Sequence, residues 1–168
     1  LLLACFNQNK TLIEENEYKK PIALTTFTVL ADMARNIAGD RILVESITKP
    51  GAEIHSYQFT PSDLIKAKGV ELIIENGLGL ELWIQKYSAV AGDIPRVVLS
   101  DGMKPLLISG DAYKGKPNPH AWMSPKRSIH YVEKIKDAFI QIDPEGIEVF
   151  SANAKLYKNK LLQLDQEL

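Results

Sequence analysis

The sequence predicts a three-layer α/β domain, in which a four-stranded parallel sheet is flanked by helices. Two observations lead to this prediction. Four short apolar runs alternate with helical patterns from residue 21 onward, which is the order of elements expected for β-α-β units. Apart from Glu71, each run is apolar at consecutive residues rather than at every second residue, as is typical of parallel strands covered on both faces. Right-handed crossovers then place the helices against the sheet.

The expected elements follow one another without an internal repeat or a low-complexity segment. The expected strands lie at residues 22–24, 42–44, 70–74 and 97–99. The expected helices lie at residues 28–39, 60–69, 80–89, 125–141 and 143–168. Gly39 is the expected stop of the first helix. A long loop, residues 100–123, separates the last strand from the helix that follows it.

Two helix starts carry strong sequence signals. Thr60 is an expected N-cap, Pro61 suits the first turn, and Asp63 completes a capping box. Ser124 followed by Pro125 is also typical of an N-cap and a first-turn proline. A helix is therefore expected to begin directly after the long loop.

The composition argues against several classes of protein. The 168 residues include 20 basic and 21 acidic side chains, which give a formal net charge of -1. This balance offers no electrostatic attraction for nucleic acid, so we expect no nucleic-acid partner. No run approaches the roughly 18 apolar residues that suggest a membrane span. The single cysteine, Cys5, rules out an internal disulfide and a cysteine-based zinc cluster.

The residues around Cys5 have two interpretations. In the first, "LLAC" (residues 2–5) is the end of a bacterial lipoprotein signal peptide, so that Ala4 precedes the cleavage point and Cys5 carries the lipid. The polar stretch 7–20 is then a flexible tether, and residues 1–20 precede the folded domain. In the second interpretation, Cys5 is a free thiol near a fraying terminus.

Two histidines are expected at the same edge of the sheet. His55 lies in "KPGAEIHSYQFTP", after the second strand, and His120 lies in "KPNPHAWMSP", after the fourth. Ligands of open α/β sheets bind at the carboxyl ends of the strands. Either histidine alone is best explained by a structural role, but together they predict a metal site. His130 lies within the expected helix 125–141, and we interpret it as a residue on the flank of that helix.

Two imidazoles are too few ligands for a tight metal site, which usually has four or more. Glu53, Glu75, Asp101 and Asp111 are candidates for the remaining ligands, but none has a convincing spacing. The last expected helix, residues 143–168, has no C-terminal stop signal. We therefore expect this helix to continue into a part of the protein that supplies further ligands. The sequence contains no nucleophile elbow, phosphate-binding loop or zinc-protease motif.

Several ordered motifs resemble a known family of metal receptors. The segments "TTFTVLADMARNIAGD", "PGAEIHSYQFTPSD", "NGLGLELW" and "GKPNPHAWMSP" are similar to the metal-binding substrate-binding proteins of bacterial ABC importers, called cluster A-I or family 9. The resemblance runs from about residue 21 to the end. It implies two α/β lobes joined by one long helix, with a metal ion in the cleft between the lobes. His55 and His120 match the two histidine ligands of the amino-terminal lobe.

The resemblance also implies a domain organisation and a role. Residues 21–143 correspond to the amino-terminal lobe, residues 144–168 to the start of the interlobe helix, and the carboxyl-terminal lobe with its carboxylate ligands is missing. The implied protein is not an enzyme. It is an extracytoplasmic receptor, in the periplasm or lipid-anchored on the outer face of the cell membrane, that delivers a metal ion to an ABC permease.

The resemblance favours manganese or iron over zinc as the bound ion. Residues 100–119 contain no histidine, whereas zinc-specific relatives often carry a histidine-rich insert there. "NPHAWMSP" also resembles the manganese and iron branch of the family, with zinc kept as an alternative. Two other functions remain open. One is a metal-assisted hydrolase that uses His55, His120 and a carboxylate such as Asp101. The other is an adhesin-like surface lipoprotein.

Overall fold

The computed structural model describes residues 19–168, apart from the side chain of Asp111. Its centre is a parallel sheet of four strands in the order β2-β1-β3-β4. The strands are β1 (Ile22–Thr25), β2 (Leu43–Ser46), β3 (Leu72–Glu75) and β4 (Arg96–Val98). The predicted four-stranded parallel sheet is confirmed, and the strand boundaries differ from the expected ones by no more than two residues.

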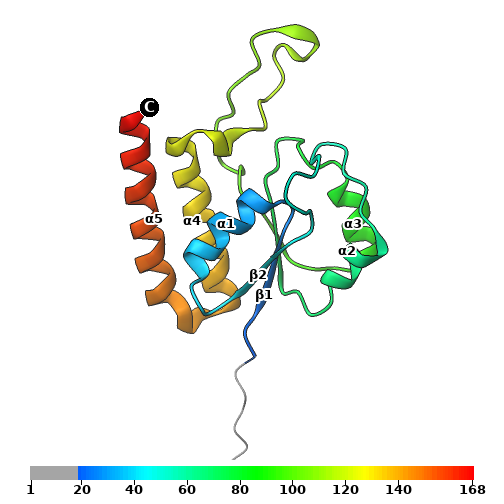
Figure 1. The fold of residues 1–168 in the computed structure, drawn as a ribbon, viewed down its shortest axis with the longest axis vertical. Coiled ribbons are helices and arrows are strands. Elements are labelled where there is room, and N and C mark those ends of the chain that lie inside the picture. The colour runs from blue at the N-terminus through cyan, green and yellow to red at the C-terminus, as the bar shows by residue number, and fades with distance from the viewer. Residues whose placement is uncertain (1–18) are drawn as a thin grey trace, which may run out of the picture.

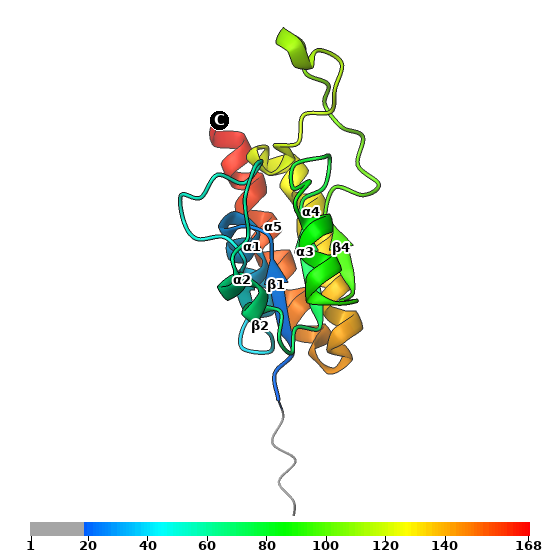
Figure 2. The ribbon, with the colours of Figure 1, turned by 90° about the vertical axis from the view of Figure 1, so that its right-hand side faces the viewer.

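Helices cover both faces of this sheet (Figures 1 and 2). On one side lie α1 (Thr28–Ala38), α4 (Pro125–Ile142) and α5 (Ile147–Glu167). On the other side lie α2 (Pro61–Lys66) and α3 (Ile84–Ala91). Within residues 19–168, no helix combines the length and the apolar character needed to cross a membrane. The three-layer arrangement predicted from the sequence is confirmed.

Most positions of the strands are apolar because the sheet separates two hydrophobic cores. Ala23 and Ile74 pack into the larger core, together with α1, α4 and α5. Their sequence neighbours Leu24 and Ile73 point to the opposite face and pack around the buried Tyr87 of α3. Alternate residues of a strand point to opposite faces of the sheet, so covering both faces favours apolar residues at consecutive positions. Full burial of Leu24 or Ile73 contributes about 1.5–3 kcal/mol relative to exposure.

The two helix starts with strong sequence signals behave differently. At α2 the capping box is present, since Asp63 N donates to Thr60 Oγ1 and Thr60 N donates to an Asp63 carboxylate oxygen at 2.8 Å. At α4 the helix begins at Pro125 as predicted, but the Ser124 side chain makes no capping hydrogen bond. Its backbone angle ψ is 118°, against 167° at Thr60. Ser124 instead supports the helix through its carbonyl, which accepts from Ser128 N at 2.9 Å.

Two predicted helices begin later than the sequence suggested. α3 was expected from residue 80, but it starts at Ile84 because the carboxylate of Glu81 turns back to accept backbone N–H groups of the preceding turn. The last helix was expected from Asp143, but Pro144–Gly146 form a 3-10 turn and α5 begins at Ile147. In both places a tight turn replaces the first helical turn.

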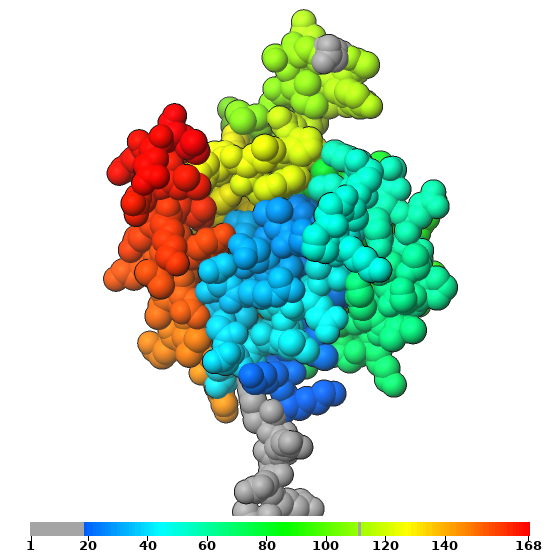
Figure 3. All heavy atoms as spheres, in the orientation of Figure 1, coloured from blue at the N-terminus to red at the C-terminus, as the bar shows by residue number. Residues whose placement is uncertain are grey.

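The long loop after β4 contains an ordered hairpin, residues 104–117, which we call the arm. It projects from the body of the domain at the carboxyl end of the sheet (Figures 1 and 3). Backbone hydrogen bonds hold its two sides together, including Ile108 N to Lys116 O at 2.9 Å and Asn118 N to Leu106 O at 2.7 Å. These bonds also hold residues 116–118, which lead to His120, against the opposite side of the arm.

Replacing Gly77 by alanine should destabilise the turn between β3 and α3. Gly77 has φ +83°, and an added Cβ would come closer than 3.0 Å to the Val98 and Ser100 side chains. The left-handed backbone alone should lower the free energy of unfolding by about 1–3 kcal/mol, and the clash should lower it further. Urea unfolding measures this loss. Gly79→Ala is the matched control, because its φ is +76° with no atom within 4 Å. Equal losses in both variants would contradict the close packing around Gly77.

Candidate metal centre

The two histidines predicted as ligands meet above the carboxyl edge of the sheet. The Nε2 atoms of His55 and His120 lie 3.3 Å apart, and the ring centroids are 5.3 Å apart. His55 comes from the loop after β2 and His120 from the loop after β4, which are the two outermost strands. The two loops therefore reach across the central strands from opposite edges of the sheet to bring the imidazoles together.

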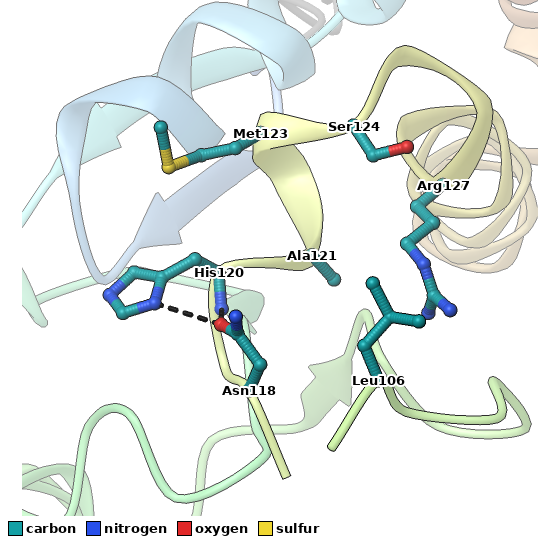
Figure 4. A pocket seen from close by; sticks show the side chains of 7 residues that line it. All are labelled: Leu106, Asn118, His120, Ala121, Met123, Ser124 and Arg127. Carbon is teal, nitrogen blue, oxygen red and sulfur yellow. Dashed lines mark hydrogen bonds between the residues drawn. The ribbon is translucent and has the colours of Figure 1, made fainter. Parts of the chain in front are cut away.

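His120 is held by the side chain that lies two residues before it. Asn118 Oδ1 lies 3.0 Å from the backbone nitrogen of His120 and 3.0 Å from its ring Nδ1. Figure 4 shows this side chain beside the imidazole, with the ring contact drawn as a dashed line. Pro119 lies between the two residues and restricts the backbone on its amino-terminal side. The Nδ1 edge of the ring is thus occupied, and the Nε2 edge faces His55.

A buried asparagine supports the His120 loop from below. Asn76 follows β3 and is fully buried, and its Nδ2 donates to the carbonyl of Pro119 at 2.9 Å. Its Oδ1 accepts from the hydroxyl of Tyr131, on α4, at 2.5 Å. A buried amide is costly unless its donors and acceptor are paired, so these contacts fix the orientation of Asn76. The position of the loop before His120 is therefore tied to the core.

Glu81 lies behind Asn76 and joins the two central strands. Its side chain accepts hydrogen bonds from Thr26 Oγ1 at 2.7 Å, from Asn76 N at 2.8 Å and from Gly77 N at 3.1 Å. Glu81 is only 4% exposed, and burial raises the pKa of its carboxyl group although these three donors oppose the rise. Thr26 follows β1 and Asn76 follows β3, so the carboxylate links the ends of both strands.

His55 is held less tightly than His120. Its backbone nitrogen donates to Glu53 Oε1 at 2.8 Å, and the carbonyl of Ile54 accepts from the indole nitrogen of Trp83 at 2.8 Å. These contacts fix the backbone of the loop, while the His55 side chain is exposed. His120 also contacts the ring of Trp122, with centroids 5.2 Å apart.

The surroundings of His120 favour its neutral form. Burial lowers the pKa of the imidazole below its usual value, and the nearby His55 lowers it further. Both effects disfavour a positive charge on the ring. A metal ion requires a neutral imidazole with a free lone pair, so His120 is prepared for coordination at neutral pH.

The spacing of the two ring nitrogens matches that of two ligands on one ion. Two nitrogens at tetrahedral angles and normal Zn–N distances lie about 3.3 Å apart, as these do. An open groove of about 640 Å³ borders both histidines, between the arm and the turn before α3. Further ligands can therefore approach the pair from the solvent side.

Among the candidate ligands whose side chains the structure describes, none joins the pair. Within residues 19–168, the side chain of Asp111 excepted, no group of three or more His, Cys, Asp and Glu side chains is placed to hold a metal ion. Glu75 is buried on β3, where its carboxylate lies 3.6 Å from the guanidinium of Arg96. His130 lies on α4, as predicted, with its Nε2 3.0 Å from the carbonyl of Asp101. Cys5 lies outside the described residues.

Sequence reasoning missed the residues that support the pair, namely Asn76, Glu81 and Asn118. A signal for them was present in the motifs. Asn76 and Glu81 are polar residues in "NGLGLELW", shortly after the apolar run 72–74, and Asn118 lies two positions before a histidine in a proline-rich loop. Polar groups at the carboxyl end of buried strands are candidates for a ligand site or for its support.

The chain also matches a known protein family over most of its length. Residues 24–168 match the family described as zinc-uptake complex component A, periplasmic. The chain belongs to this family. The resemblance to metal receptors of ABC importers, drawn from ordered sequence motifs, is thereby confirmed.

Individual members of the family show how much of their length this chain spans. It is 47% identical over 150 residues to the iron-binding protein YfeA of Yersinia pestis, covering 89% of this chain and 48% of YfeA. It is 33% identical over 173 residues to the manganese ABC transporter substrate-binding lipoprotein PsaA of Streptococcus pneumoniae. This match covers 99% of this chain and 55% of PsaA. The structure of an Mn-bound periplasmic metal binding protein from Candidatus Liberibacter asiaticus superposes with a TM-score of 0.74 at 34% sequence identity. The superposition covers 84% of this chain and 53% of that protein. The chain spans about half the length of these relatives.

Removing the neighbouring imidazole should raise the pKa of His120. In the metal-free chain, His55→Ala removes the charge that disfavours protonation of His120, while the burial of His120 remains. The pKa should therefore rise but stay below the usual histidine value, as NMR titration of the His120 ring can measure. His130→Ala is the control, since His130 contacts Asp101 instead, and it should leave the pKa of His120 unchanged. An unchanged or lower pKa in His55→Ala would contradict the electrostatic coupling of the pair.

Proposed function

We propose that the chain is the histidine-bearing, amino-terminal half of a receptor that captures a divalent metal ion for an ABC importer. The observation that carries this proposal is the convergence of two Nε2 atoms at 3.3 Å, the spacing of two ligands on one ion. The family match and the similarity to proteins named for iron and manganese binding support it.

In the proposed mechanism the protein captures the ion without chemical reaction. Neutral His55 and His120 donate their Nε2 lone pairs to the ion. The other ligands are carboxylates from a second lobe, which corresponds to the half of the relatives' length that this chain does not span. Residues 144–168, which include α5, are the start of the helix that joins the lobes. The open groove beside the pair is the side from which the second lobe completes the site.

Manganese or iron is the proposed ion, with zinc as the alternative. Two imidazoles and two carboxylates form a ligand set suited to manganese or ferrous iron by ligand hardness. The similarity to YfeA and PsaA, named for iron and manganese, agrees with this preference. The family description refers to zinc uptake, so zinc remains a candidate for the bound ion.

The proposed location is the extracytoplasmic side of the cytoplasmic membrane, where the loaded receptor meets an ABC permease. The family is described as periplasmic and PsaA as a lipoprotein, and both descriptions support this location. A lipid on Cys5 would anchor the protein, with the residues up to 20 as the tether.

A metal-assisted hydrolase is the weaker alternative. That function requires a third protein ligand and a general base close to the ion. Asp101, the carboxylate considered for that role, does not form a metal-holding group with His55 and His120. The family and its relatives named as transporter components also favour a receptor.

Removing either histidine should weaken metal binding. In calorimetric titration with Zn²⁺, His55→Ala and His120→Ala should each lose at least tenfold in affinity, which is about 1.4 kcal/mol, and the double variant should lose more. His130→Ala is the control and should bind as the unaltered chain does. A version extended to the full length of the relatives should bind one ion far more tightly. If the 168-residue chain binds the ion as tightly as the extended version does, its own ligand set is complete, and the hydrolase hypothesis gains support.

The affinity of this chain should increase in the order Mn²⁺, Fe²⁺, Zn²⁺. Two neutral imidazoles impose no size or charge selection, so raw affinity should follow the Irving–Williams series. Competition titrations under anaerobic conditions measure the order. Tighter binding of Mn²⁺ than of Zn²⁺ by the short chain would show that residues within it already select for the metal.

A further inference from the structure

The side-chain amide of Asn118 has only one possible orientation. Its Oδ1 lies 3.0 Å from the backbone nitrogen of His120, and a backbone N–H can only donate. The atom that faces it must therefore be the oxygen and not the amide nitrogen. This removes the usual ambiguity of an asparagine side chain, in which oxygen and nitrogen can be exchanged.

The orientation of Asn118 in turn determines the tautomer of His120. The same Oδ1 lies 3.0 Å from His120 Nδ1, and an oxygen without a proton can only accept. Nδ1 must therefore carry the proton. In a neutral imidazole the other nitrogen, Nε2, then holds the free lone pair. His120 thus presents its lone pair to the position that a metal ion would occupy.

His55 must have the opposite tautomer before metal binds. Its Nε2 lies 3.3 Å from the Nε2 of His120. Two lone pairs facing each other at this distance repel, so one of the two nitrogens must carry a proton. Because Nε2 of neutral His120 has none, the proton lies on Nε2 of His55, which donates to His120. Among the described residues, no side-chain acceptor lies within hydrogen-bond distance of His55 Nδ1, so nothing favours a proton there.

We propose that Asn118 is a positioning residue that holds His120 as the Nδ1–H tautomer, so that His120 is the first ligand of the incoming ion and His55 the second. This inference rests on the proposed function. When the ion binds Nε2 of His120, the proton on Nε2 of His55 moves through water to Nδ1 of the same ring. The exchange leaves the ring neutral, releases no net proton, and is open to water because His55 is exposed.

The test is the tautomer of each ring, read from the ¹⁵N chemical shifts of the histidine side chains in the metal-free chain. At about pH 8, imidazoles in water are neutral. The unaltered chain should show a protonated Nδ1 at His120 and a protonated Nε2 at His55. Asn118→Ala should convert His120 into a mixture of both tautomers, whereas Asn118→Asp keeps the acceptor oxygen and should retain the protonated Nδ1. If His120 has the same tautomer in Asn118→Ala as in the unaltered chain, the proposal is overturned.

Zn²⁺ affinity provides a second measurement on the same variants. Loss of a contact that orients a ligand typically costs 10- to 100-fold in affinity, so Asn118→Ala should bind about that much more weakly and Asn118→Asp should not. Asn36→Ala is a matched control, because Asn36 donates to Asp32 O on the surface of α1, away from the site. If a version extended to the full length of the relatives binds no Zn²⁺, the proposed function fails, whereas the positioning of His120 is decided by the tautomer measurement alone.

Discussion

The geometry of the candidate site depends on one buried carboxylate, that of Glu81. It accepts from groups at the ends of both central strands, Thr26 after β1 and Asn76 after β3. A buried carboxylate is costly unless several donors satisfy it, so the surrounding backbone has little freedom to move. Asn76 extends this rigid point through its side chain to the carbonyl of Pro119. The loop that carries His120 is thereby built on the point where the strand order reverses, the usual ligand position in open α/β sheets.

The two histidines are supported unequally, and this asymmetry suits the proposed capture of a metal ion. His120 is partly buried and contacts Asn118 and the ring of Trp122. His55 is exposed on a loop whose backbone alone is fixed. A rigid first ligand lowers the entropic cost of binding, whereas a more mobile second ligand can adjust to ions of different size. A site with two equally rigid imidazoles would lack this tolerance.

Much of the fold could be predicted from the sequence because it depends on local patterns. Strands covered on both faces have consecutive apolar residues, as at residues 72–74, and the capping box of Thr60 and Asp63 marks a helix start. The histidine pair was also accessible, since the carboxyl ends of parallel strands share one edge. The strand order and the supporting residues could not be predicted from the sequence. Asn76 and Glu81 act through contacts with segments far away in the sequence, and the late start of α3 follows from one of these contacts. The motifs show that polar residues stand at these positions, but no local pattern encodes the contacts that they make.

The origin of the two imidazoles on opposite edge strands has a consequence for folding. β2 and β4 do not touch each other, so His55 and His120 are brought together only when all four strands are paired in their native order. An ion held by both rings would close a loop of 65 residues and act as a reversible cross-link across the sheet. Such a link favours the native chain over every unfolded conformation that separates its ends. The proposed cargo would then also stabilise the fold, and loss of the ion would weaken the cooperativity between the two halves of the sheet.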